Sequence, residues 1–177
     1  MASENYFQLF GLPSQYDIDA AALEATWRAL AARVHPDRYA TAGAAERRVA
    51  MQWASTINEA YRVLKSPLDR ARYLCEQAGC DLQIESNTRM DGAFLMRQME
   101  WREQLDEARD GGSLGDFDAL QADIEASRAR MAQDMARLLD QERNYAQAAG
   151  KVREWMFIEK FAQEVLDARH ALTDRQH

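Results

Sequence analysis

The stretch "RVHPDRY", at residues 33–39, decides how the first part of the chain folds. Before it, apolar residues recur every three to four positions from Leu23 to Val34, which is typical of an amphipathic helix. Pro36 cannot continue that helix, because it lacks an amide N–H and clashes with the preceding turn. We therefore predict a helix that begins at the N-cap Asp19, ends at about Val34, and leaves the tripeptide His-Pro-Asp at the start of a polar loop.

Helical patterns flank this loop on both sides. A short aromatic segment, "NYFQLFGLP" at residues 5–13, comes before the first helix, and a long helix over residues 44–64 follows the loop. The expected core face of that long helix is Trp53, Ile57, Ala60, Tyr61 and Leu64. Ser66 as N-cap and Pro67 at the first helical position then predict a further helix to about residue 78. The two long helices should lie antiparallel across the loop.

The second half of the chain has a different pattern, with three longer helices and no aromatic opening segment. They are expected at roughly residues 89–109, 116–142 and 145–172. Near-heptad spacing in the middle helix, from Phe117 to Leu138, suits an antiparallel bundle. The fold class is therefore all-α, with one module over residues 1–79, a linker over 80–88, and a three-helix bundle over 89–177.

Composition and charge exclude several classes of protein. Hydrophobic residues make up 47% and charged residues 29% of the 177, which suits a globular chain. The net charge of −7 argues against a general nucleic-acid binder, and no apolar run is long enough to cross a membrane. The N-terminus lacks the pattern of a secretory signal. Cys75 and Cys80 match no zinc pattern, so we expect no metal, no cofactor and a cytoplasmic setting.

Two helices of the bundle carry apolar residues on the side away from their expected core. In the first, Phe94, Trp101, Leu105 and Ala108 share one narrow arc and should be buried. The other side holds Leu95, Met96 and Met99, together with Glu100, Glu103 and Glu107.

In the last helix, the expected core arc is Ala148, Val152, Trp155, Ala162 and Leu166. Phe157 should point the opposite way, near Arg153, Lys160 and Phe161. Exposed methionine ringed by acids is typical of a protein-binding surface, whereas the alternative is packing against another helix.

The first half of the chain resembles a J-domain, the module that stimulates ATP hydrolysis in seventy-kilodalton heat-shock chaperones. The resemblance covers about residues 4–75 and rests on "YFQLFGLP", "HPDR" and "INEAYRVLKSPLDRARY". It implies that a chaperone's ATPase domain is contacted by His35, Pro36 and Asp37, with Arg28, Arg33 and Arg38 supplying positive charge. The helix departs from the family pattern, because alanine fills the solvent-facing positions 25, 29 and 32. Fewer charges give weaker electrostatic steering toward the chaperone.

The whole chain resembles the HscB-type J-proteins of iron–sulfur cluster assembly, through the additional segment "AFLMRQMEWREQLDEA". That resemblance implies an L-shaped molecule whose bundle binds the cluster scaffold protein (IscU type) and passes it to a dedicated chaperone (HscA type). The implied scaffold-binding residues are Leu95, Met96, Met99, Glu100, Glu103, Glu107 and Phe157. Members from eukaryotes often add a cysteine-rich zinc module and a transit sequence, and this sequence shows neither pattern. We therefore expect a bacterial cytoplasmic protein. We expect a monomer, with weak self-association left open.

Other functions remain as alternatives. His35 and Asp37 could form a catalytic pair, although such a pair usually needs further partners, and the other histidines lie near the C-terminus. A general co-chaperone would bind many unfolded clients, but it usually carries glycine-rich or zinc-binding segments. A structural coiled-coil protein would associate through the faces of Met96 and Phe157. The polar loop could also be a solvated turn without a partner.

Overall fold

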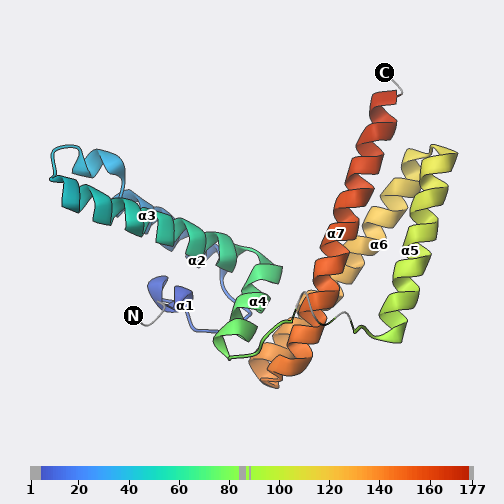
Figure 1. Ribbon diagram of the computed structural model, residues 1–177, viewed down its shortest axis with the longest axis horizontal. Coiled ribbons are helices and arrows are strands. Elements are labelled where there is room, and N and C mark those ends of the chain that lie inside the picture. Colours follow the sequence, from blue (N-terminus) through green and yellow to red (C-terminus); the bar gives the residue numbers. More distant parts are fainter. Residues whose placement is uncertain (1–4, 84–86, 88, 176–177) are drawn as a thin grey trace.

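The computed structural model describes residues 5–83, 87 and 89–175, and within them it contains helices and no strand. Two arms meet near α4 to form an L (Figure 1). The elements are α1 (Tyr6–Leu9), α2 (Ala20–Arg33), the 3-10 helix η1 (Pro36–Tyr39), α3 (Ala44–Lys65), α4 (Pro67–Gln77), α5 (Gly92–Gly111), α6 (Leu114–Met135), the π-helical segment η2 (Ala136–Gln141) and α7 (Tyr145–Arg175). None of these helices is both long and apolar enough to cross a membrane. The predicted all-α class is confirmed.

The first arm is a hairpin of α2 and α3, with α1 packed against α3. Asp19 caps α2 as predicted, since its carboxylate accepts the backbone N–H groups of Ala21 and Ala22 at 3.0 and 3.1 Å. Trp27 of α2 stacks on Tyr61 of α3, with 4.6 Å between ring centroids. The hairpin therefore depends on the caps and the apolar stripe that the sequence predicts.

The prediction that Trp53 belongs to the core of the hairpin is wrong. Ile57, Ala60 and Leu64 are buried on α3, but Trp53 is 38% exposed. α1 packs on α3 beside α4, where Tyr6 stacks on Tyr73, and it has only four residues, about 6 Å of helix. Trp53 lies two turns before Ala60, roughly 10 Å along the axis, so the short helix cannot cover both.

The second arm is an antiparallel bundle of α5, α6 and α7 (Figure 1). The predicted core positions of α5, from Phe94 to Ala108, are all buried, and so are those of α6 and η2. On α7, Ala148, Val152 and Trp155 are buried as predicted. Farther along, Ala162 and Leu166 are only half-buried, and Ile158, Phe161 and Val165 are buried instead. The buried arc shifts because α7 packs on α4, α5 and α6 rather than on one partner.

The two arms share one continuous core where α4 lies against α7. Ala71 and Cys75 of α4 are fully buried there. Burial raises the pKa of the Cys75 thiol to about 12, with a smaller contribution from the neighbouring Cys80, so Cys75 stays protonated at neutral pH. Of the predicted linker, residues 84–86 and 88 lie outside the described part. The division into modules over 1–79 and 89–177 stays a prediction, because the core crosses the boundary.

An ion pair between α6 and α7 gives the bundle a predictable response to acid. The guanidinium of Arg128 donates to both carboxylate oxygens of Glu159, at 2.8 and 2.7 Å, and the indole of Trp155 donates to one of them at 3.0 Å. Burial acts to raise the pKa of Glu159, but hydrogen bonding and attraction from Arg128 outweigh it, so the pKa is lowered. The charged pair therefore stabilises the fold above the carboxyl's unfolded pKa, about 4.3.

We expect Glu159→Gln to lower the free energy of unfolding at neutral pH and to lose this effect in acid. A depressed folded pKa means that the stabilisation is complete above about pH 5 and disappears as the pH falls through the folded pKa. Denaturant titrations from neutral pH down to about pH 3 would measure the convergence of the two proteins. Glu125→Gln is the matched control, because Glu125 contacts the same arginine but is mostly exposed. A constant difference at every pH would contradict the assignment.

Candidate functional site

The His-Pro-Asp tripeptide forms a sharp, exposed corner at the distal end of the first arm. Pro36 begins the 3-10 helix η1, so this part of the predicted irregular loop is in fact one ordered turn. The imidazole Nδ1 of His35 accepts the backbone N–H of Asp37 at 3.3 Å, and the hydroxyl of Tyr39 donates to the carbonyl of Arg33 at 3.4 Å. These bonds tie the corner to the end of α2. We call residues 35–37 the HPD corner.

The side chains of the HPD corner are open to solvent. The side chains of His35 and Asp37 are 59% and 91% exposed, with 3.6 Å between Nδ1 and the Asp37 carboxylate. In a neutral imidazole with an unprotonated Nδ1, this atom has one lone pair. Here that lone pair accepts the hydrogen bond from the Asp37 N–H. Within the described residues, no group of three or more histidine, cysteine and carboxylate side chains is arranged to hold a metal ion. What the corner offers is an imidazole and a carboxylate that point into solvent.

The three arginines predicted to add positive charge near this corner differ in their surroundings. Arg28 is exposed, but its guanidinium pairs with Glu24 of the same helix at 2.6 Å. Arg33 and Arg38 flank the HPD corner and are also exposed. The predicted solvent-facing alanines at positions 25, 29 and 32 are exposed as well. The positive charge is therefore concentrated beside the corner, because Glu24 offsets the charge of Arg28.

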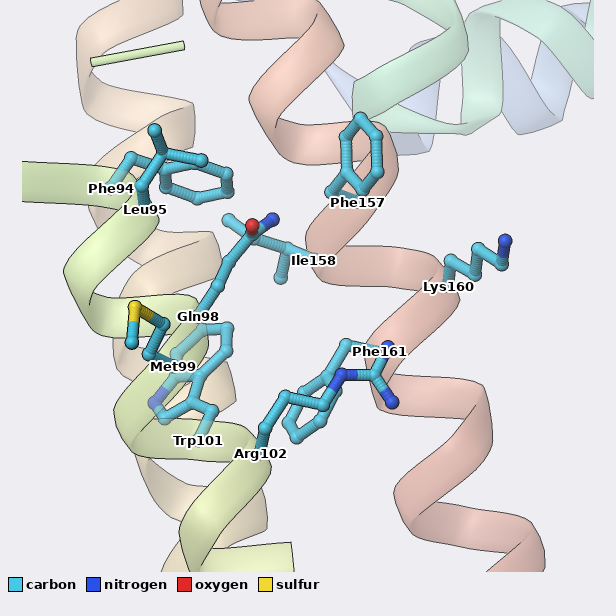
Figure 2. A pocket seen from close by; sticks show the side chains of 10 residues that line it. All are labelled: Phe94, Leu95, Gln98, Met99, Trp101, Arg102, Phe157, Ile158, Lys160 and Phe161. Carbon is cyan, nitrogen blue, oxygen red and sulfur yellow. The ribbon is translucent and has the colours of Figure 1, made fainter. Parts of the chain in front are cut away.

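The second arm has an open groove of about 640 Å³ between α5 and α7. Leu95 and Met99 of α5 and Phe157 of α7 line it from its two sides (Figure 2). Its inner wall contains Trp101 and Phe161, whose rings stack with 5.4 Å between centroids. We call this the α5–α7 groove. The structure thus brings together three of the predicted outward residues from two helices about 60 positions apart in sequence.

Large apolar side chains in and beside the groove are open to solvent. Leu95 is 45%, Met96 64%, Met99 72% and Phe157 42% exposed. Burying each of these side chains would contribute about 1–3 kcal/mol of favourable free energy. Leu95, Met99 and Phe157 gather at one groove, and such a cluster marks an interaction surface more often than a tolerated defect. Thioether side chains can also adjust to the shape of a partner.

Not all the predicted scaffold-contact residues lie in the groove. Its lining excludes Met96, Glu100 and Glu103, which are exposed elsewhere on α5. Glu107 instead lines a second hollow between α5 and α6. An acidic outer face therefore runs beside the apolar groove. The prediction that Phe161 accompanies Phe157 outward is wrong, because Phe161 is 6% exposed and packs on Trp101.

The groove also contains polar residues that sequence reasoning did not identify. Gln98 and Arg102 follow Leu95 and Met99 on α5 at the helical spacing of three and four, and that spacing was the available signal. Arg102 pairs with Glu164 across the groove, with 3.1 Å between one guanidinium nitrogen and one carboxylate oxygen. Its guanidinium carbon lies 5.3 Å from the centre of the Phe161 ring. Lys160 lines the groove too, but its side chain extends away from α5 (Figure 2).

Comparison with known proteins identifies the family to which this chain belongs. A family model described as "HSCB C-terminal oligomerisation domain" matches residues 90–166. The "Co-chaperone protein HscB homolog" of Bordetella petrii is 63% identical over 171 residues, which cover 97% of this chain and 99% of that protein. The chain belongs to the HscB family of co-chaperones. The HscB homolog of Cupriavidus taiwanensis is 48% identical over 171 residues, covering 97% of each chain.

Solved structures of HscB proteins have the same architecture. The chaperone HscB from Vibrio cholerae matches with a TM-score of 0.82 and 35% identity, over 96% of this chain and 99% of that one. Human co-chaperone HscB matches with a TM-score of 0.86 over 93% of this chain and 82% of that one. At 22% identity, the human protein supports the fold alone. The resemblance to HscB-type J-proteins and the J-domain-plus-bundle fold are therefore confirmed.

Proposed function

We propose that this HscB-family co-chaperone binds an iron–sulfur cluster scaffold protein (IscU type) and delivers it to a heat-shock chaperone (HscA type) whose ATP hydrolysis it stimulates. The α5–α7 groove would hold the scaffold, and the HPD corner would contact the chaperone's ATPase domain. Hydrolysis then locks the chaperone onto the scaffold and aids transfer of the cluster. The iron belongs to the scaffold as cargo, and the reacting phosphate belongs to the chaperone.

The observation that carries this proposal is the pair of exposed surfaces on different arms. Leu95, Met99 and Phe157 form an apolar groove in the bundle, whereas His35 and Asp37 lie at the end of the hairpin. A protein that must hold a client and touch a chaperone at once needs two separate faces. An adaptor of this kind raises the local concentration of the client at the chaperone, as any bivalent linker does.

The chemistry of each surface suits its proposed partner. Burying the groove residues in a complex supplies affinity, and the acidic face of Glu100, Glu103 and Glu107 favours a basic region of the scaffold. At the other end, Arg33 and Arg38 favour an acidic region of the chaperone. The glutamates beside the groove and the arginines beside the corner have opposite sign, which favours a different partner at each surface.

Calorimetric titration with the scaffold, followed by ATPase assays, tests the proposal. We expect one-to-one binding of the scaffold with a negative heat-capacity change, because the interface buries apolar surface. We also expect this protein and the scaffold together to stimulate the chaperone more than the sum of their separate effects. Absence of scaffold binding would overturn the client assignment. A merely additive effect would overturn delivery as the mechanism.

Self-association through the same groove is a second candidate, and the description of the family model as an oligomerisation domain favours it. Two copies could bury their exposed Met99 and Phe157 side chains against each other. Light scattering at rising protein concentration would detect such a dimer. The scaffold should dissociate it, because both would use one face. A dimer that persists in excess scaffold would separate the oligomer face from the groove.

A further inference from the structure

The carboxylate of Asp140 joins the two arms at their corner. Asp140 lies in η2, at the end of the bundle nearest to the first arm. One of its oxygens accepts the backbone N–H of Tyr16 at 2.7 Å, and the other accepts that of Asp17 at 2.9 Å. A two-point bond between one side chain and two successive peptide groups fixes orientation as well as distance.

The backbone of residues 16–17, which donates to Asp140, is also hydrogen-bonded to the first arm on its other side. The guanidinium of Arg70 in α4 donates to the carbonyl of Tyr16 at 2.7 Å and to that of Leu64 at 2.7 Å. Its carbon lies 4.8 Å from the centre of the Tyr16 ring, and Tyr16 is 4% exposed. The segment at residues 16–17 therefore lies between an arginine of one arm and a carboxylate of the other. A rotation between the arms would break these bonds.

The π-helical turn determines where Asp140 points. In η2, the N–H of Glu142 donates to the carbonyl of Arg137, five residues earlier, at 2.9 Å. Each such turn inserts one residue relative to an α-helix and rotates the residues after it by about 100°. A regular continuation of α6 would aim Asp140 elsewhere. π-helical turns of this kind often occur at functional positions.

The rest of the junction is mainly apolar packing, together with a hydrogen bond from the guanidinium of Arg153 in α7 to the carbonyl of Leu82 at 2.9 Å. Ala71 and Cys75 of α4 are buried against the second arm, but hydrophobic contact is not directional and allows tilting. The hydrogen bonds that the Asp140 carboxylate accepts from the backbone of the other arm do depend on angle. Among the described contacts across this corner, these two hydrogen bonds join the bundle directly to residues 16–17, which lead into α2.

We propose that Asp140 is a positioning residue that fixes the angle between the arms, and thereby the placement of the α5–α7 groove relative to the HPD corner. The functional part of this inference rests on the proposed function, since it concerns how a bound scaffold is presented to the chaperone. Neither surface contains Asp140, so its loss leaves each binding step intact. The step that suffers is the extra ATPase stimulation produced when both partners are bound.

The test measures the inter-arm distance by double electron–electron resonance. Spin labels at Gln52→Cys of α3 and Gln104→Cys of α5 report on the two arms, and Cys80→Ser in every sample removes the half-exposed native thiol. Asp140→Asn keeps the shape but turns one acceptor into a donor that faces a backbone N–H. We expect its distance distribution to broaden. Asp140→Glu keeps both acceptors on a longer stem, and a shifted but narrow distribution is expected.

Asp134→Asn is the matched control, because it removes the same charge from α6 where the partner is Arg137 of the same arm. It should leave the distances unchanged. In ATPase assays, Asp140→Asn should keep scaffold affinity and scaffold-independent stimulation but lose the extra stimulation by the scaffold. Unchanged distances, or the same loss in Asp134→Asn, would overturn the inference. If the unmodified protein fails to bind the scaffold, the proposed function falls, and the distances still decide whether Asp140 fixes the angle.

Discussion

His35→Gln is expected to abolish stimulation of the chaperone's ATPase and to leave scaffold binding unchanged. The amide oxygen of glutamine can accept the Asp37 N–H as Nδ1 does at 3.3 Å, so the corner keeps its backbone. The exposed imidazole is then the group that is lost. Removing a central contact typically costs about 2 kcal/mol or more, or roughly 30-fold in affinity, so the variant should give almost no stimulation at the concentration where the unmodified protein is half-maximal.

Steady-state ATP hydrolysis by the HscA-type chaperone, measured against the concentration of this protein, checks the result. His170→Gln is the matched control, because His170 is an exposed histidine on α7, in the other arm. That variant should stimulate like the unmodified protein. Impaired scaffold binding by His35→Gln would contradict two independent surfaces. Full stimulation by His35→Gln would show that the corner is not the chaperone contact.

The helix ends near the HPD corner were predictable because their signals are local. Asp19 caps α2 and Ser66 caps α4 through bonds to backbone groups two or three residues away, and Pro67 begins α4. Pro36 ends α2 through its own ring. Each signal acts within one helical turn, so the sequence alone suffices to place it.

The π-helical turn before α7 could not be predicted in this way. The sequence from Phe117 to Leu138 continues its apolar repeat without a proline or glycine, so a regular helix to residue 142 is the simplest interpretation. In this π-turn, the carboxylate of Asp140 accepts a hydrogen bond from the backbone N–H of Tyr16, 124 residues earlier in the chain. Hydrophobic periodicity contains no information about such a contact.

The outward residues of the groove were more fully predictable on α5 than on α7, where Phe157 was placed correctly and Phe161 was not. On α5, the arc that contains Phe94 and Trp101 is buried throughout, so Leu95 and Met99 were placed correctly. On α7, the buried arc shifts between neighbours, and Phe161 turns inward to stack on Trp101. Arg102 was missed for a related reason, because its importance depends on Glu164 of a helix that periodicity cannot position.

Met99→Ser combined with Phe157→Ser is expected to abolish measurable scaffold binding while preserving the fold. The two side chains line the α5–α7 groove from different helices, so a partner inserted there would contact both (Figure 2). Losing a central apolar contact costs about 2 kcal/mol or more, and two such losses weaken Kd by roughly three orders of magnitude if they add. Because Met99 is 72% and Phe157 42% exposed, little core packing is lost.

Calorimetric titration of the double variant with the scaffold, beside denaturant unfolding of the same sample, separates binding from stability. Met51→Ser is the matched control: Met51 is 69% exposed, but it lies on α3 in the first arm. It should bind the scaffold normally. Stimulation of the chaperone without scaffold should survive in the double variant, since the HPD corner is untouched. If the double variant still binds with unchanged affinity, the groove is not the scaffold site, and the acidic outer face of α5 with Met96 becomes the surface to alter.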